Sequence, residues 1–443
     1  MPQSATAPKT GRWSTTLNIS KAMNPVDYKL EEFARYCLSS GDSSARAWVF
    51  SDGPPFPLSD GTRSFSAPDS KLSIHLVDQY HGRTPHLVNL NTLTRGPDVQ
   101  IGFRPFVVLD SNVVSYVDRF FRGKLEPEPS EAVRRFVSFL FDNNVDPTPV
   151  FYYIESLSKT DRERWRGFAS LFAETHLALQ TLDRDLFRET GRLASSLERR
   201  ETQVRFHGAE DASHLIGSYL DSISPDNART ESGSVSLSYA ALLKVALMRV
   251  AGPRSLADRF NELGDYMASH LGAVLGMERF AAVLHWAAPE RFAKMIPPLQ
   301  KGMSATKFFG KLGSTAWDLY LGRMPEQLGR FVSPASSDGA EAVCDLYYVA
   351  TGEDALAELI RHRTIELLVQ HADSKASSKV VGQLSTPFED HMSPDELADF
   401  ARRTGEHDRL LMATASQRTS LSGPALDDLV SDLESQVVAA CRS

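Results

Sequence analysis

The sequence predicts an α/β fold with a parallel β-sheet and a large all-α insertion. Two apolar strands support this prediction: one covers 106–109 and ends at Asp110, and the other covers 342–350 and ends at Thr351. Each strand is followed directly by a polar turn and an amphipathic run. Near-continuous apolar strands are typical of parallel sheets with both faces covered. Between them, residues 160–300 show an almost uninterrupted helical periodicity, which indicates the insertion.

The length, net charge and cysteine content of the chain limit the classes of protein to which it can belong. A chain of 443 residues is long enough for two or three domains. Its net charge of −8 argues against binding nucleic acid by bulk electrostatics, but it is compatible with local basic patches. Three cysteines without metal-type spacing favour a reducing, cytoplasmic environment. Because the sequence has no signal-peptide pattern and no apolar run of membrane-spanning length, we expect neither secretion nor membrane insertion.

Residues 1–104 are expected to form a small N-terminal α/β region. Helical spacing over 27–37 is followed by three strand-like runs at 45–50, 71–77 and 86–90. Loops rich in proline, glycine, serine and aspartate separate these runs.

The α/β domain proper is expected over 105–370. A helix follows Asp110, and a second helix over 130–142 has Ser130 as its expected N-cap. Prolines then hold the chain in a short extended segment, after which Glu155 falls in the first turns of an apolar helix. A carboxylate on a largely buried helix is usually paired or bound to a metal.

The helical insertion is expected to cover about 160–310. After a glycine-rich approach, Asp318 is expected at the start of another apolar helix. The strand 342–350 then leads into Thr351-Gly-Glu353-Asp354 and a helix, followed by a strand over 364–370. Residues 371–443 are expected to form a helical tail, whose last helix covers 425–441.

The acidic residues of these segments are expected to meet at the carboxyl edge of one sheet, where open α/β sheets bind their ligands. Carboxylates packed together repel one another, and a divalent cation removes this conflict. Oxygen-only ligands suit Mg²⁺ or Mn²⁺, which can activate water for attack on a phosphodiester. The expected metal ligands are Asp110, Glu155, Asp318, Glu353 and Asp354.

These motifs resemble the ordered acidic motifs of PIN-like domains, which are metal-dependent nucleases common among toxin and phage-defence effectors. The resemblance is carried by Val108-Leu-Asp110-Ser-Asn112, Tyr153-Ile-Glu155-Ser, Ala316-Trp317-Asp318-Leu and Thr351-Gly-Glu353-Asp354-Ala-Leu. It covers about 105–370, interrupted by the helical insertion. The family's last motif is usually Thr-x-Asp, whereas Thr351-x-Glu353 stands here with Asp354 one place on, so the fourth ligand is either of these two acids.

The resemblance implies a Rossmann-like parallel sheet and a nuclease with Mg²⁺ or Mn²⁺ as cofactor, and it favours a ribonuclease over a deoxyribonuclease. It implies that the acids are catalytic and that Asn112 and Thr351 orient carboxylates or the attacking water. The expected partners are a nucleic-acid substrate and, at the helical insertion, a regulatory protein or a second copy of the chain.

Each acid also has a purely structural explanation. Asp110 is a residue type that often caps helices, first-turn acids favour the helix dipole without a metal, and a buried glutamate can be paired with an arginine. The structural partners that compete with the metal are Arg162 or Arg164 for Glu155 and Ser314 or Thr315 as the cap before Asp318.

Two other functions compete with nuclease activity. The α/β unit can be a catalytically inactive scaffold whose helical insertion docks a protein partner through amphipathic helices. The geometry around Asp110 also suits an aspartyl-phosphate mechanism, but that chemistry requires a second aspartate where Asn112 stands.

Two further features have simpler explanations. Glu278 lies at an expected helix start, where capping accounts for it. A basic and aromatic run can be a nucleic-acid track, although a solvated face beside a core stripe is the expected reading. This run contains Lys301, Lys307, Phe308, Phe309, Lys311 and Trp317.

Overall fold

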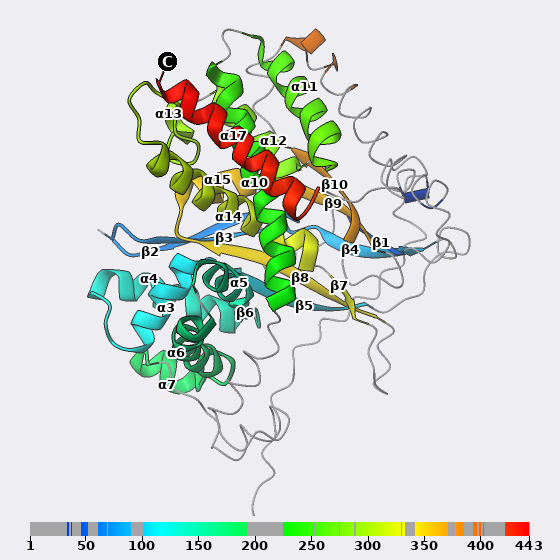
Figure 1. Cartoon of the computed structure of the whole chain (residues 1–443). Helices are drawn as coiled ribbons and strands as arrows, with labels where there is room; N and C mark the ends of the chain where they lie inside the picture. Colours follow the sequence, from blue (N-terminus) through cyan, green and yellow to red (C-terminus); the bar gives the residue numbers. More distant parts are fainter. Residues whose placement is uncertain are drawn as a thin grey trace, which may run out of the picture.

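A computed structural model gives the architecture of the chain (Figure 1). It describes residues 33–34, 37, 46–51, 61–68, 70–89, 101–160, 162–192, 225–250, 254–273, 275–287, 289–328, 330–332, 342–370, 377–384, 393–396, 398–399, 402 and 421–442. Residues 193–224 of the predicted helical insertion lie outside these residues.

A mixed β-sheet forms the centre of the molecule, and the strand order is β2-β3-β8-β5-β6, with β7 also paired to β8. Strand β5 is parallel to both β8 and β6, whereas β3 and β7 run antiparallel to β8. The α/β class is therefore confirmed, but the sheet is parallel only across β8, β5 and β6. The strands are β2 (Thr62–Ser66), β3 (Ser73–Val77), β5 (Ile101–Leu109), β6 (Asp146–Thr148), β7 (Arg330–Val332) and β8 (Ala342–Thr351).

A second, antiparallel sheet has the strand order β10-β9-β1-β4. It combines N-terminal strands with strands from the end of the α/β region and from the expected tail. The N-terminal strands thus complete the two sheets and do not form a sheet of their own. The members are β1 (Arg46–Ser51), β4 (Thr84–Asn89), β9 (Arg363–Gln370) and β10 (Ser377–Leu384).

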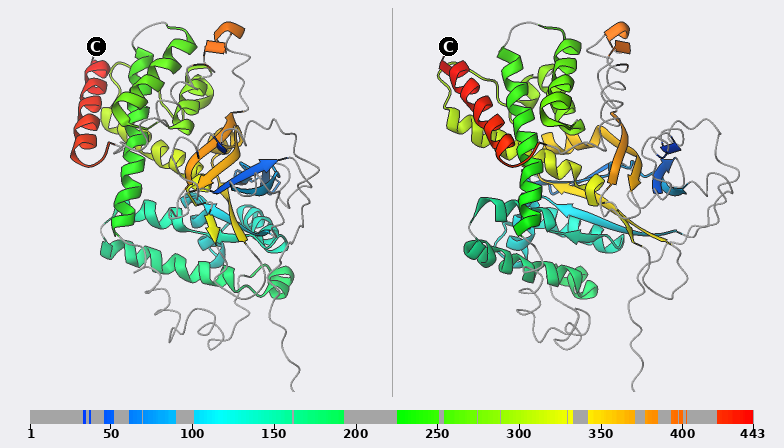
Figure 2. Two further views of the ribbon diagram at one scale, coloured as in Figure 1. Left: turned by 90° about the vertical axis from the view of Figure 1, so that its right-hand side faces the viewer. Right: turned by 45° about the vertical axis from the view of Figure 1, so that its right-hand side comes forward.

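Helices cover both faces of the central sheet. In Figure 1 the cyan to blue-green helices lie below it and the green, yellow-green and red helices lie above it, and Figure 2 shows the same layers from two other sides. The lower helices are α3 (Ser111–Phe121), α4 (Pro127–Asp142), α5 (Val150–Lys159), α6 (Arg162–Gln180) and α7 (Arg184–Thr190). The upper helices are α10 (Pro225–Val250), α11 (Leu256–Tyr266), the π-helix η2 (Met267–Leu271), α12 (Gly276–Ala287), α13 (Pro289–Phe292), α14 (Ala305–Leu328), α15 (Asp354–Arg361) and α17 (Pro424–Arg442).

Alternate residues of the central strands face different helical layers, as the period of two in a strand requires. Val107 and Leu109 belong to the core shared with α3 and α4, whereas Val108 and Val349 belong to the core shared with α10, α12, α14 and α15. The same alternation places Asp110, two residues after Val108, on the side of α14.

Several expected boundaries were wrong. Helix α14 begins at Ala305, so Asp318 lies in its interior and not at a helix start. The glycines that precede Asp318 predict a loop, but Gly310 and Gly313 are helical. Helix α4 begins at Pro127, so Ser130 is not its N-cap. Proline is well suited to the first position of a helix, because its missing N–H has no intrahelical partner there.

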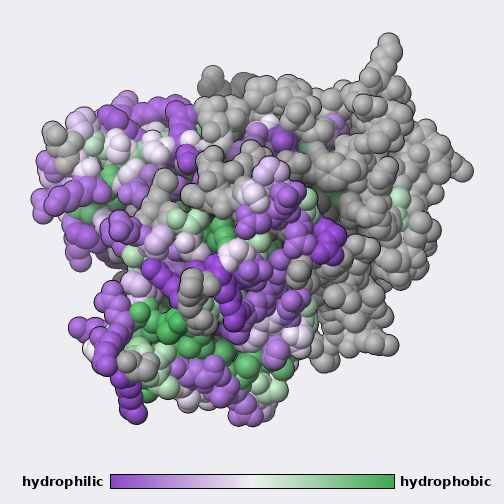
Figure 3. Space-filling model, turned by 90° about the horizontal axis from the view of Figure 1, so that it is seen from above, coloured by the Kyte–Doolittle hydropathy of each residue, from purple (hydrophilic) through white to green (hydrophobic). Residues whose placement is uncertain are grey.

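Within the described ranges, one helix is long and apolar enough to cross a membrane by length and composition, namely α10 over Gly233–Val250. Half of that segment is buried inside the protein, and its residues contribute to the core with α12, α14 and α17. These contacts are those of a core helix. Seen from above, the described surface presents mainly hydrophilic side chains, with hydrophobic ones in smaller patches (Figure 3).

Candidate metal site at the carboxyl edge of the central sheet

Strands β5 and β8 are parallel neighbours, so their carboxyl ends lie side by side at one edge of the central sheet. Strand β5 has β6 on one side and β8 on the other. The helix after β5, α3, packs on one face of the sheet, whereas the helix after β8, α15, packs on the other. In α/β sheets ligands bind at the strand ends where the following helices diverge in this way. We call this place at the carboxyl ends of β5 and β8 the crevice.

Asp110 is the first residue in this crevice. It is 5% exposed, and its backbone N–H donates to the Ala350 carbonyl at 2.9 Å, which joins the ends of the two strands. Asp110 occupies the N-cap position of α3, yet its side chain makes no capping hydrogen bond. Its carboxylate oxygen Oδ2 instead accepts from the Thr351 hydroxyl at 2.6 Å. The explanation of Asp110 as a helix cap is therefore wrong.

The pKa of Asp110 is raised to about 6: burial is the main cause, the charges of Glu155 and Glu353 add to the rise, and the Thr351 and Ser111 hydrogen bonds oppose it. Asp318 shows the same effect more strongly. Burial raises its pKa to about 8, with Asp110, Glu155 and Glu353 adding to the rise and Lys311 opposing it. Each of the four acids is thus close enough to affect the protonation of another, so the structure brings Asp110, Glu155, Asp318 and Glu353 together.

Glu155 reaches the crevice from α5. Its Oε2 accepts a hydrogen bond from the Ser111 hydroxyl, and its Oε1 forms an ion pair with Lys159 at 2.6 Å. Lys159 lies one helical turn after Glu155, so the cationic partner comes from α5 itself. The expected structural partners were arginines of the following helix.

The two acids after β8 take different positions. Glu353 occupies the N-cap position of α15 without a side-chain capping bond, and its charge acts on Asp110 and Asp318. The side chain of Asp354 is 89% exposed and binds His75 Nε2 at 2.7 Å on the neighbouring strand β3. Of the two candidates for the fourth ligand, the structure places Glu353 with the other acids and directs Asp354 to His75.

Two polar residues shape the turn between these acids. The Thr351 side chain is fully buried, and its hydroxyl accepts from the Glu353 N–H at 3.1 Å while it donates to Asp110. The Asn112 side-chain oxygen accepts from the Gly352 N–H at 3.1 Å. Asn112 and Thr351 thus hold the β8–α15 turn against the β5–α3 turn.

The donor set fits a hard divalent cation. All four acids offer oxygen ligands, which Mg²⁺ and Mn²⁺ prefer. The pKa values of Asp110 and Asp318 are raised first by burial, and the charges of neighbouring acids add to the rise. In the described part of the chain, no three histidine, cysteine or acidic side chains already have the arrangement of a metal shell. Carboxylate oxygens of Asp110 and Glu155 are instead bound by Thr351, Ser111 and Lys159.

Glu278 does not belong to this cluster. It is fully buried in α12, where it accepts from the Ser238 hydroxyl at 2.5 Å and lies 3.4 Å from the Arg323 guanidinium. The predicted helix start is confirmed, because Glu278 lies in the first turn of α12, and its carboxylate is also bound by Ser238 and Arg323. Nearby, Arg363 of β9 forms an ion pair with Glu326 of α14.

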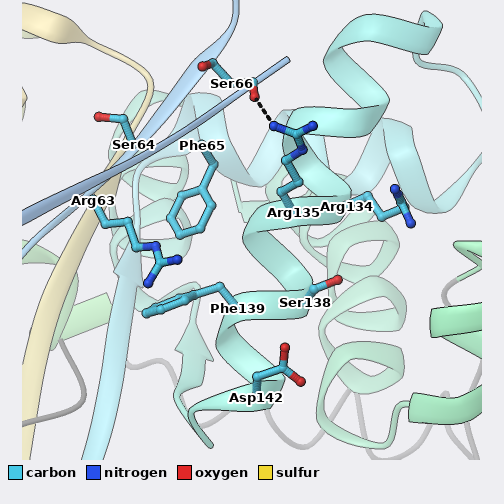
Figure 4. A pocket seen from close by; sticks show the side chains of 9 residues that line it. All are labelled: Arg63, Ser64, Phe65, Ser66, Arg134, Arg135, Ser138, Phe139 and Asp142. Carbon is cyan, nitrogen blue, oxygen red and sulfur yellow. Dashed lines mark hydrogen bonds between the residues drawn. The ribbon is translucent and has the colours of Figure 1, made fainter. Parts of the chain in front are cut away.

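A cavity of about 490 Å³ lies elsewhere, between β2 and α4 (Figure 4). Its arginines are already engaged: Arg134 and Arg135 both bind Glu131, and the Arg63 guanidinium lies 4.5 Å from the centre of the Phe139 ring. None of the four clustered acids lines this cavity.

Sequence reasoning missed two residues at the acid cluster, Ser111 and Lys159. Ser111 lies between two residues that were singled out, and Lys159 is four residues after Glu155 on the same helical face, so both had a local signal. Lys311 was named only as a member of the basic and aromatic run, because its closeness to Asp318 depends on the continuity of α14 through two glycines.

Comparisons of the chain with protein-family models, with curated proteins and with solved structures find no match. The resemblance to PIN-like domains therefore stays a prediction from the residues.

Proposed function

We propose that this protein is a metal-dependent nuclease that hydrolyses phosphodiester bonds of RNA or DNA. The observation that carries the proposal is that Asp110, Glu155, Asp318 and Glu353 come together at the carboxyl ends of β5 and β8. The pKa values of Asp110 and Asp318 are raised by burial and by the neighbouring acids. Raised carboxyl pKa values in a crevice are typical of sites that bind a cation or carry out chemistry.

A bound Mg²⁺ or Mn²⁺ would supply Lewis acidity and lower the pKa of a water molecule. Asp110, Glu155, Asp318 and Glu353 would hold it, and the metal would compete with Lys159 for Glu155. Thr351 keeps Asp110 oriented through its hydroxyl, and Asn112 keeps the Thr351-Gly-Glu353 turn in place. A cytoplasmic role as a toxin or phage-defence effector, with a regulatory partner at the helical layer, is part of the same proposal.

The test measures cleavage of end-labelled single-stranded RNA and DNA with Mg²⁺, with Mn²⁺ and with a chelator. Loss of several kcal/mol of transition-state stabilisation predicts that Asp110→Asn lowers the rate by about 10³-fold or more. Asp185→Asn is the matched control, because Asp185 is 91% exposed and paired with Arg188 of the same helix.

Wild type and control should cleave with metal and not with chelator. Cleavage that resists the chelator, or that Asp110→Asn leaves intact, would refute the proposal. A protein that cleaves no nucleic acid and holds a stoichiometric protein partner would instead support the docking scaffold.

A further inference from the structure

One face of α14 forms an exposed stripe that leads to the acid cluster. Lys307, Lys311, Ser314 and Asp318 follow one another at spacings of four, three and four residues, which places them on the same side of the helix. The first three are exposed, and Asp318 is partly buried. The stripe therefore runs from solvent into the crevice.

The surface beside this stripe is open. Gly310 lies next to Lys307 and Lys311 on the helix and is exposed, and a side chain added there would meet nothing within 4 Å. Of the aromatic members of the same run, Phe308 and Trp317 are 1% and 7% exposed in the core, and Phe309 is partly buried against that core. The run thus divides into a core stripe and a basic, sterically unobstructed face.

The two lysines also keep their charges available. Neither Lys307 nor Lys311 forms an ion pair with another described residue, whereas Lys159 and Lys244 are paired with Glu155 and Glu262. Lys311 is close enough to Asp318 for its charge to act on that carboxylate. From Lys307 to Lys311 the helix rises about 6 Å, and from Lys311 to Asp318 about 10 Å.

We propose that α14 binds the substrate of the proposed nuclease, with Lys307 and Lys311 contacting successive backbone phosphates of a single-stranded nucleic acid and leading it to the acids. This inference rests on the proposed function for the nature of the ligand. Phosphate contacts of this kind position a strand without reading its sequence.

The recessed position of Asp110 favours a single strand over a duplex. Asp110 is only 5% exposed, so a phosphodiester has to enter the crevice to reach it. A single strand bends into such a recess freely, whereas a duplex has to be deformed at an energetic cost.

The test uses Asp110→Asn in the full chain, which keeps the strand uncut, and measures the Kd of a fluorescent single-stranded RNA of about 20 nucleotides at several salt concentrations. Loss of two phosphate contacts predicts that Lys307→Ala/Lys311→Ala weakens binding about 10- to 25-fold near 0.1 M salt and lowers the salt slope by about 1.4. Lys307→Arg/Lys311→Arg should restore both values. Lys124→Ala, an exposed lysine on the α3–α4 loop, is the matched control.

An unchanged Kd in Lys307→Ala/Lys311→Ala would overturn the inference. So would a dependence on Arg63 of the β2–α4 cavity in place of the lysines (Figure 4). The two proposals fail separately. Lysine-dependent binding by a wild type that never cuts would refute only the nuclease, and efficient cutting that ignores the lysines would refute only the role of α14.

Discussion

Helix α14 contributes to two groups of carboxylates that have different charged neighbours. Near its middle, Asp318 faces three other acids, with lysines as the cations identified nearby. Near its end, Glu326 lies against Arg363, and Arg323 reaches Glu278 of α12. We call these the acid cluster and the ion-pair network.

The difference in charged neighbours indicates a different role for each group. In the ion-pair network the chain supplies its own guanidinium groups, and Arg363 and Arg323 lower the pKa of Glu326 against the burial that raises it. In the acid cluster burial and the neighbouring acids raise the pKa values of Asp110 and Asp318, so protons are retained at pH values where carboxyl groups are normally ionised. A buried site that lacks its counter-charge is suited to receive a cation, whereas one that contains it is suited to hold helices together.

The largest expected effect concerns the ion-pair network. Arg363→Met leaves Glu326 buried without its closest cation, which should lower the free energy of unfolding by about 3–5 kcal/mol in urea titrations. The double variant Glu326→Leu/Arg363→Met removes both charges and should recover most of that loss. If the single variant proves as stable as wild type, the network does not hold α14 as described.

Added metal should stabilise the acid cluster, and more so at high pH. Because the folded pKa values of Asp110 and Asp318 are raised to about 6 and about 8, the unfolded chain binds fewer protons between pH 4 and 8. Their contribution to stability is therefore fully present below about pH 4 and is lost as pH rises to about 8. Mn²⁺ at 100 times its Kd should return about 2.7 kcal/mol, measured as a shift in Tm.

The same titration at pH 5 should show a smaller shift, because protons compete with the metal for the carboxylates. Equal shifts at the two pH values would contradict the assignment of these acids as ligands. Asp185→Asn, far from the cluster, should behave as wild type.

Removing one charge from the acid cluster should stabilise the metal-free protein. Asp318→Asn keeps the shape of the side chain and removes a carboxylate that burial and three neighbouring acids oppose, so unfolding at pH 8 should require about 1–3 kcal/mol more. Cleavage should be lost in the same variant. A clear destabilisation, together with retained cleavage, would identify Asp318 as a structural residue.

The smallest effect is expected at Asp354. Its ion pair with His75 is exposed, and such pairs contribute about 0–1 kcal/mol, so Asp354→Asn should change both stability and cleavage little. Glu353→Gln, one residue earlier, should lower the cleavage rate strongly, because Glu353 lies with the other acids. The reverse order of the two variants would show that Asp354 is the fourth ligand.

The sequence by itself determined the strands and turns that present Asp110 and Thr351. A short apolar run followed by a polar turn and a helical pattern is a local signal, and the structure confirms both strands and the α/β class. The final helix and the strand after α15 were also predicted correctly, because hydrophobic periodicity is a property of neighbouring residues.

Only the tertiary structure decided which charges meet. Pairing of β5 with β8 brings Asp110 to Thr351, which lies 241 residues away in the chain. The interior of a long α14, continuous through two glycines, then carries Asp318 to them and fixes the direction of Lys307 and Lys311. Hydrophobic spacing reports which face of an element is buried, but the partner against which that face packs is set by long-range contacts, and these contacts assemble the acid cluster.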